Sequence, residues 1–255
     1  MLFLFLQKRI IMSIKKHIPN FITLLNLFAG CIAVFYAVLG HLEMSALFVV
    51  LGIVFDFFDG FVARLLNVQG ELGKQLDSMA DMVTSGLVPG MILFQLLLRA
   101  STNTPLLEVF HPKTIEFLPF IGLVVTLASA YRLANFNIDS RQTSSFIGLP
   151  TPANTLLIIS LPLIITYSDI NFIVSLLHNP FILIVICGLS SYLLNAEIPL
   201  FALKFKNFTW KDNSYKYVFV AFSVIVLFGL KFAAIPVIIF SYILFSIWQA
   251  SKNNN

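Results

Sequence analysis

Four aspartates lie in a part of the chain that is otherwise strongly apolar. Asp56 and Asp59 come near the end of one hydrophobic segment, and Asp77 and Asp81 come at the start of the next. An ionisable group inside a membrane span is costly and is usually there for a function. Spacings of three and four residues place each pair on one face of its own helix. Four carboxylates arranged in this way predict a site for hard divalent cations such as Mg²⁺ or Mn²⁺.

Arg64 follows the first pair of aspartates on the same predicted helix. Its planar guanidinium matches the oxygens of a phosphate group. Divalent ions neutralise phosphate oxygens, and two of them can stabilise both the attacking and the leaving group of a displacement. One of the carboxylates can also act as a general base. The segment therefore predicts phosphoryl chemistry with a divalent-metal site.

The segment between the two acidic pairs, residues 67–70 (Asn-Val-Gln-Gly), is typical of a turn. It predicts an antiparallel helical hairpin with all four carboxylates at a similar, shallow depth in the membrane. Gly60 and Gly73 lie on the same hairpin, and small residues beside a polar site leave room for a ligand.

Composition sets the fold class. The chain is 58% hydrophobic and 11% charged, with a mean hydropathy of +0.92, which is outside the range of a soluble domain of this length. We expect an all-α polytopic membrane protein. Hydropathy predicts about eight transmembrane helices, at residues 20–39, 43–66, 74–98, 117–136, 152–168, 178–196, 215–230 and 232–249; the last two would also suit one broken segment.

The positive charges predict the orientation. With eight spans and an inner N-terminus, thirteen of the sixteen lysines and arginines fall on the inner side, and only Arg99, Lys113 and Lys231 fall outside. This is the asymmetry of the positive-inside rule, so the termini and the acidic site should be cytoplasmic. The cations are spread over short loops, which favours attraction to membrane lipids and excludes a nucleic-acid-binding domain. Cys31 and Cys187 fall within predicted spans, so neither a disulfide nor a thiolate metal site is expected.

The N-terminal residues have a different pattern. Residues 7–18 mix lysine and arginine with isoleucine at intervals that suit a short helix on the membrane surface, and Pro19-Asn20 is expected to end it. We therefore predict a juxtamembrane amphipathic segment at 1–18 and a single integral membrane domain at 19–255.

Residues 56–81 read D-x2-D-G-x2-A-R-x8-G-x3-D-x3-D. This pattern resembles the signature of the CDP-alcohol phosphatidyltransferase family, without departures. The resemblance implies a core of six transmembrane helices, a homodimer, and transfer of a phosphatidyl or similar group from a CDP-linked donor to an alcohol with release of CMP.

Three further stretches, around residues 18–26, 131–137 and 146–153, resemble the membrane-bound CDP-diacylglycerol–serine O-phosphatidyltransferases of bacteria and archaea. This resemblance implies CDP-diacylglycerol and L-serine as substrates and the bacterial inner membrane as location. Asn135 departs from the pattern, because that group often has a second arginine there.

The resemblance also implies roles for individual residues. Asp56 and Asp77 would bridge two metal ions, Asp59 and Asp81 would each complete one of them, and Asp81 would accept the proton of the acceptor hydroxyl. The CDP-lipid would contact Asn20, Thr23, Gly60, Arg64 and Gly73.

Some alternatives stay open at this stage. Arg132 and Arg141 suit an anionic acceptor such as the serine carboxylate, but Arg132 also suits a positive-inside anchor. The same chemistry could use glycerol 3-phosphate or an inositol phosphate, although such acceptors need more cations. An ion-coupled transporter is a third reading, which the confinement of the acidic residues to one hairpin disfavours.

Overall fold

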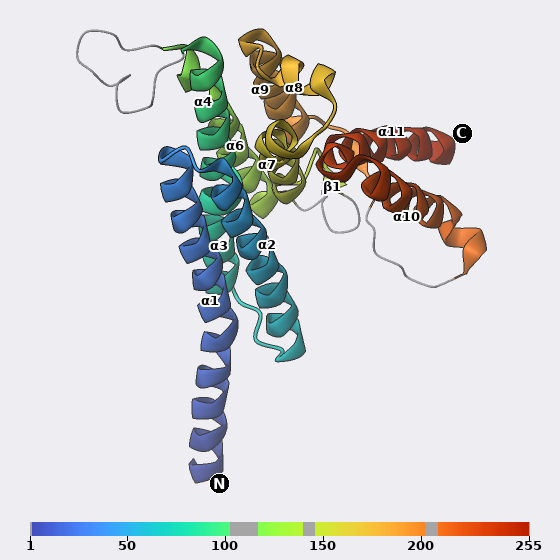
Figure 1. The fold of residues 1–255 in the computed structure, drawn as a ribbon. Helices are drawn as coiled ribbons and strands as arrows, with labels where there is room; N and C mark the ends of the chain where they lie inside the picture. Colours follow the sequence, from blue (N-terminus) through green and yellow to red (C-terminus); the bar gives the residue numbers. More distant parts are fainter. Residues whose placement is uncertain (1, 103–116, 140–145, 202–208, 255) are drawn as a thin grey trace.

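A computed structural model describes residues 2–102, 117–139, 146–201 and 209–254. The first half of the chain forms α1 (Leu2–Val38), α2 (Leu42–Leu65), α3 (Glu71–Asp81), the π-helical turn η1 (Met82–Leu87) and α4 (Val88–Ser101). The 3₁₀ turn η2 (Leu118–Leu123) then leads into α6 (Val124–Ile138). The prediction of an all-α membrane bundle is confirmed (Figure 1).

The second half continues the bundle. It contains α7 (Thr151–Tyr167), α8 (Asn171–Leu177), α9 (Pro180–Asn195), α10 (Trp210–Leu230), the 3₁₀ turn η4 (Lys231–Ala233) and α11 (Ala234–Asn254). A short antiparallel ladder pairs β1 (Phe146–Ile147) with β2 (Pro199–Leu200). It ties the segment before α7 to the segment after α9.

The core lies where α1, α2, α4, α7 and α9 meet. Ala33, Ala37 and Ala46 are buried between α1 and α2, and such small residues let two membrane helices pack closely. Large apolar side chains, among them Ile92 and Leu97 of α4, fill the centre. Many apolar side chains on the outside are exposed, as expected for helices that face lipid rather than water.

The number of spans differs from the prediction of about eight. Every predicted span contains a helix, but in the described residues only five helical runs are long and apolar enough to cross a membrane, or six if the bent pair α8 and α9 counts as one. The reasons are local. The 17-residue α7 is short, α8 and α9 meet at an angle of 78°, and α10 to α11 form one continuous apolar run. The structure is that of an integral membrane protein.

The predicted break at Pro19-Asn20 is wrong. α1 continues from Leu2 to Val38 with Pro19 inside it, and its N-terminal part projects beyond the other helices (Figure 1). Proline removes one hydrogen bond to the carbonyl four residues earlier, which here belongs to the exposed residue Lys15. Water or lipid headgroups can satisfy that carbonyl, so the helix tolerates the proline. The division into residues 1–18 and 19–255 stays a prediction.

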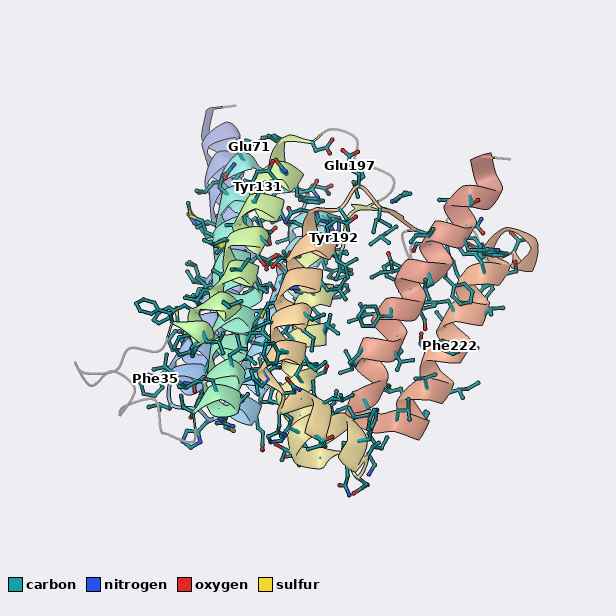
Figure 2. The ribbon with its side chains drawn as sticks, turned by 90° about the horizontal axis from the view of Figure 1, so that it is seen from above. Phe35, Glu71, Tyr131, Tyr192, Glu197 and Phe222 are labelled. Carbon is teal, nitrogen blue, oxygen red and sulfur yellow. The ribbon has the colours of Figure 1, made fainter. Side chains whose placement is uncertain are left out.

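Residues 215–249 were predicted to form either two spans or one broken segment, and in the structure they form two helices. α10 and α11 are joined by η4, where Lys231 has a φ of 50°. Figures 1 and 2 show them side by side as a pair next to the rest of the bundle. Cys31 and Cys187 are both free, as predicted.

Candidate active site

The hairpin of α2 and α3 brings three of the four aspartates together. Carboxylate oxygens of Asp56, Asp59 and Asp77 all lie within 4.8 Å of one another. The turn that reverses the chain contains Asn67 at a φ of 54°, a left-handed conformation that asparagine tolerates better than most residues. The structure thus contains the predicted antiparallel hairpin, with acidic residues from both of its helices close together.

Asp81 lies one helical turn beyond Asp77, and its side chain interacts with that of Asp56. On its other side it accepts a hydrogen bond of 3.4 Å from the amide nitrogen of Asn26 on α1. Asp81 thus lies at the edge of the acidic cluster, held between α1 and α2.

The Asn26 side chain is itself held in place by a hydrogen bond from Thr84. Thr84, in the π-helical turn after α3, donates to the Asn26 side-chain oxygen at 2.8 Å. This leaves the Asn26 amide group to point toward Asp81. A π-helical turn is a frequent feature of functional sites because it shifts the side chains of one helix relative to its neighbours. Sequence reasoning did not assign a role to Asn26 or Thr84; the signal that could have found Asn26 is a buried amide in an apolar span.

One pocket contains all five residues predicted to contact a CDP-lipid. Its volume is about 650 Å³, and its lining includes Asn20, Thr23, Gly60, Arg64 and Gly73 together with Asp59 and Asp77. The structure therefore brings these residues to one opening beside the carboxylates.

Two of the three glycines that line this pocket, Gly60 and Gly73, face its polar side chains. A Cβ atom added at Gly60 would lie 3.6 Å from Arg64 Nη1, and one added at Gly73 would lie 3.4 Å from the Asn20 side-chain oxygen. The absence of side chains at these positions keeps Arg64 and Asn20 accessible to a ligand. Nothing lies within 4 Å of a Cβ added at Gly70, so the turn is open as well.

The acidic residues fit a divalent cation. Asp59 Oδ2 is buried and has no hydrogen-bond partner among the residues that the structure describes, which is a costly state for a carboxylate oxygen unless a cation binds it. The donor set is all oxygen, as magnesium and manganese prefer.

Comparison with known proteins agrees with this geometry. The family model described as CDP-alcohol phosphatidyltransferase matches residues 16–203. The chain belongs to the CDP-alcohol phosphatidyltransferase family. The matched region contains all four aspartates and the whole pocket lining, and it ends before α10.

Three of the relatives that the chain resembles carry the same name. The chain is 32% identical to the CDP-diacylglycerol–serine O-phosphatidyltransferase of Bacillus subtilis, over 72% of this chain and 89% of the relative. It is 31% identical to the enzyme of the same name from Methanocaldococcus jannaschii, over 65% of this chain and 71% of the relative. It is 29% identical to the Saccharomyces cerevisiae enzyme of that name, over 57% of this chain and 53% of the relative.

A second polar network joins α3, the second helix of the acidic hairpin, to α6. Lys74, which lines the pocket, donates from Nζ to the carbonyl of Asn137 at 2.8 Å. The Asn137 side-chain amide in turn donates to Ser78 Oγ at 2.8 Å. From the sequence, no role was assigned to Lys74, Ser78 or Asn137. These contacts join residues about sixty positions apart in the chain, so they depend on tertiary packing and leave no local pattern in the sequence.

Arg132 is not an anchor at the lipid surface. It is 5% exposed and donates from Nε to the carbonyl of Leu149 at 2.6 Å and from Nη2 to that of Gly148 at 3.3 Å. It lines a different pocket, of about 780 Å³, together with Asn135, Asn195 and Glu197. The structure does not place Arg132 in the lining of the Arg64 pocket, so its role toward an acceptor stays a prediction. Arg141 lies outside the described residues.

Proposed function

We propose that this protein transfers a phosphatidyl group from CDP-diacylglycerol to L-serine, giving phosphatidylserine and CMP. The carrying observation is the cluster of Asp56, Asp59 and Asp77, because two of these residues, Asp59 and Asp77, line the same pocket as Arg64. The names of the relatives support the substrate pair, and membership in the family supports the reaction class.

The four aspartates would hold two ions, Mg²⁺ or Mn²⁺. Asp56 and Asp77 would be shared between the two ions, with Asp59 on one and Asp81 on the other. When bound, the ions supply charge neutralisation for the pyrophosphate oxygens of the donor and for the leaving phosphate. The unpartnered Asp59 oxygen and the all-oxygen donor set support this assignment.

Arg64 would bind phosphate oxygens of the donor through its guanidinium. Gly60 and Gly73 leave space for the donor to approach, and Asn20 and Thr23 offer polar groups at the head of the first span. The side chains of Phe57, Phe58 and Phe61 are exposed on the same helix, α2. They provide an apolar surface along which the acyl chains of the donor would remain in the membrane.

Asp81 would accept the proton. The serine hydroxyl oxygen forms a bond to the phosphorus that carries the diacylglycerol, and the bond from that phosphorus to the bridging oxygen of CMP breaks. CMP leaves as a phosphate, and the hydroxyl proton passes to the Asp81 carboxylate. The hydrogen bond from Asn26 would orient Asp81 toward the acceptor.

Arg132 and Arg141 would recognise the carboxylate of serine. The opening beside Arg132 also contains Asn135 and Asn195. Arg132 also donates to the backbone carbonyls of Leu149 and Gly148, which hold its guanidinium in place.

The site would open to the cytoplasm. The excess of lysine and arginine on the predicted inner side supports this orientation in a bacterial inner membrane. The resemblance to the family supports a homodimer.

The test is incubation of membranes carrying the protein with CDP-diacylglycerol, Mn²⁺ or Mg²⁺ and a panel of labelled alcohols, with CMP and labelled lipid as readouts. Asp56→Asn and Asp77→Asn should abolish both products. The matched control is Asp169→Asn, because that carboxylate is 97% exposed and pairs only loosely with Lys231 at 3.9 Å. CMP release by the Asp56 and Asp77 variants at the wild-type rate would contradict the assignment of the site.

A further inference from the structure

A second pocket lies at the opposite end of the helices from the aspartates. Its volume is about 550 Å³, and it is lined by the turn between α1 and α2, the start of α2 and the last turns of α4 and α7. Its inner lining is apolar and buried and includes Leu42, Leu96 and Pro162. Its outer lining is polar and exposed and includes His41, Glu43 and Arg99. The pocket is therefore amphipathic. It lies at the end of the spanning helices opposite the aspartates, which would place it near the headgroups of the other leaflet when these helices cross a membrane.

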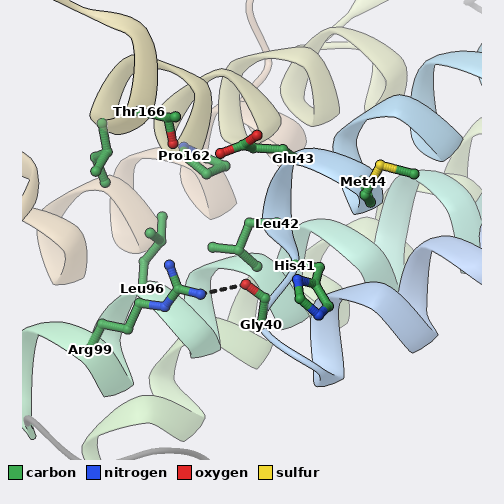
Figure 3. A pocket seen from close by; sticks show the side chains of 10 residues that line it. Gly40, His41, Leu42, Glu43, Met44, Leu96, Arg99, Pro162 and Thr166 are labelled. Atoms are coloured by element: carbon green, nitrogen blue, oxygen red, sulfur yellow. Dashed lines mark hydrogen bonds between the residues drawn. The ribbon is translucent and has the colours of Figure 1, made fainter.

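Two opposite charges face this pocket from different helices. Figure 3 shows the Arg99 guanidinium and the Glu43 carboxylate at opposite ends of the pocket, with Leu42 between them. Arg99 donates from Nη2 to the carbonyl of Gly40. Glu43 accepts from the Tyr167 hydroxyl at 2.9 Å. Within the part of the chain that the structure describes, the two charges are not joined in an ion pair.

Each charge is held in place with binding capacity left over. The guanidinium has five N–H donors, and a carboxylate has about four acceptor sites. The contacts with Gly40 and Tyr167 orient the two groups and use one donor and one acceptor of that capacity. A fixed cation and a fixed anion, separated by an apolar surface, are complementary to a zwitterion with an apolar part.

We propose that this pocket binds the headgroup of a zwitterionic phospholipid with a primary ammonium group, as in phosphatidylethanolamine, from the leaflet opposite the active site. Arg99 binds the phosphate, Glu43 accepts hydrogen bonds from the ammonium group, and Leu42, Leu96 and Pro162 contact the glycerol and the upper acyl chain. A choline headgroup cannot donate to Glu43, and an anionic glycerol headgroup offers it no positive charge.

The proposal is tested by native mass spectrometry of the purified full chain, titrated with phosphatidylethanolamine, phosphatidylcholine and phosphatidylglycerol. We expect the ethanolamine lipid to bind about tenfold more tightly than the other two, which corresponds to one charge-assisted hydrogen bond. Glu43→Gln should remove this preference. Arg99→Gln should weaken binding of all three lipids by a similar factor.

Lys231→Gln is the matched control. It removes one positive charge at the same end of the molecule but lies outside the pocket, so it should bind the ethanolamine lipid like the wild type. Because Arg99 also caps the Gly40 carbonyl, a second variant guards against misfolding. Thr166→Trp leaves both charges in place and fills the pocket from its exposed rim, and it should weaken lipid binding as Arg99→Gln does.

The proposal is overturned if the Glu43 and Arg99 variants keep the wild-type affinities and preference, or if Lys231→Gln loses as much. It is also overturned if water-soluble glycerophosphoethanolamine displaces the lipid at equal concentration, since the ligand would then be a free zwitterion. CDP-diacylglycerol, which has phosphates but no ammonium group, should compete no better than phosphatidylglycerol, so the preference for the ethanolamine lipid is independent of the proposed catalytic function.

Discussion

Asn26 donates a hydrogen bond of 3.4 Å to Asp81, from a helix that carries none of the four aspartates. Because Thr84 binds the amide oxygen of Asn26, the Asn26 side chain has one favourable orientation. The carboxylate proposed to accept the proton is thus positioned by α1 and by the π-helical turn that follows α3.

Asn26→Ala should lower kcat more than it raises KM for the donor, because Asp81 loses the group that orients it while the CDP-lipid pocket is unchanged. We expect a loss of about tenfold or more, the size of one hydrogen bond to a charged group. Steady-state kinetics with serine as acceptor provide the measurement. Asn26→Asp is the informative companion, since it places a fifth carboxylate beside the site and should lower activity further. An unchanged kcat in the alanine variant would remove Asn26 from the mechanism.

Gly52→Ala should disturb the same network from α2. A Cβ atom there would lie 2.6 Å from Thr84 Cγ2 and 2.9 Å from the Asn26 side-chain oxygen, so these side chains would have to shift. Overpacking of this kind costs about 1–3 kcal/mol. Thermal unfolding in detergent should therefore show a lower midpoint, accompanied by reduced activity.

Gly188→Ala is the control for that substitution. Gly188 lies within α9, and nothing lies within 4 Å of a Cβ added there. Its replacement should leave activity unchanged and raise the unfolding midpoint slightly, because alanine is favoured over glycine inside a helix by about 0.5–1 kcal/mol. If both variants melt alike, the close approach of α2 to Thr84 is not what limits stability.

The helical spacing of the aspartates and the turn-like residues 67–70 were sufficient to predict the acidic hairpin. Both are local features: three- and four-residue intervals fix a helix face, and a short polar turn fixes an antiparallel return. Membership of Asn20, Thr23 and Arg64 in one pocket came from the family resemblance, and the geometry of the pocket agrees with it.

Other features could not be predicted because they depend on tertiary packing. The helix continues through Pro19 because the carbonyl it leaves free is on an exposed turn. The π-helical turn at 82–87 places Thr84 against Asn26, which no periodicity in the sequence encodes. From the sequence, Arg132 suited a surface anchor as well as a residue that recognises the acceptor. Only the folded chain shows that it is buried and donates to the carbonyls of Gly148 and Leu149.

Activity should depend absolutely on a divalent cation. Without one, the carboxylates of Asp56, Asp59 and Asp77 would lie within 4.8 Å of one another with nothing to offset their charge, and the buried Asp59 Oδ2 would lack a hydrogen-bond partner among the described residues. Chelation with EDTA should abolish CMP release, and Mn²⁺ or Mg²⁺ should restore it. A metal-binding readout separate from turnover is available: calorimetric titration of Mn²⁺ should give two sites per chain in the wild type and weaker binding in Asp59→Asn. Full CMP release in excess EDTA is the outcome that refutes a metal requirement.

Arg64→Lys should be poorly tolerated. Lysine keeps the positive charge but loses the planar, bidentate geometry that matches phosphate oxygens. We expect the KM for CDP-diacylglycerol to rise by about tenfold or more, as for the loss of a charge-assisted hydrogen bond. Arg99→Lys makes the same exchange at the far end of the bundle and should leave this KM unchanged. If both variants leave the KM for CDP-diacylglycerol unchanged, Arg64 acts as a positive-inside anchor and does not bind the donor phosphate.

Serine should support CMP release from CDP-diacylglycerol, whereas glycerol 3-phosphate and inositol phosphate should not. A phosphorylated acceptor brings two further negative charges, and Lys74, which lines the pocket together with Arg64, already donates to the carbonyl of Asn137. The comparison of initial rates at equal acceptor concentrations decides the matter. If glycerol 3-phosphate is the better acceptor, the family assignment stands and the proposed acceptor is wrong.

Asp81→Asn separates binding from proton transfer. The amide keeps the size of the side chain and one oxygen that can bind a metal ion, but it does not accept the hydroxyl proton. If Asp81 is the general base, the variant should still bind CDP-diacylglycerol in the presence of Mn²⁺, while turnover falls by on the order of 10²–10⁴. Donor binding measured by equilibrium dialysis, alongside single-turnover CMP release, distinguishes the possibilities. Loss of donor binding would assign Asp81 chiefly to the metal site, and near-normal turnover would show that another group takes the proton.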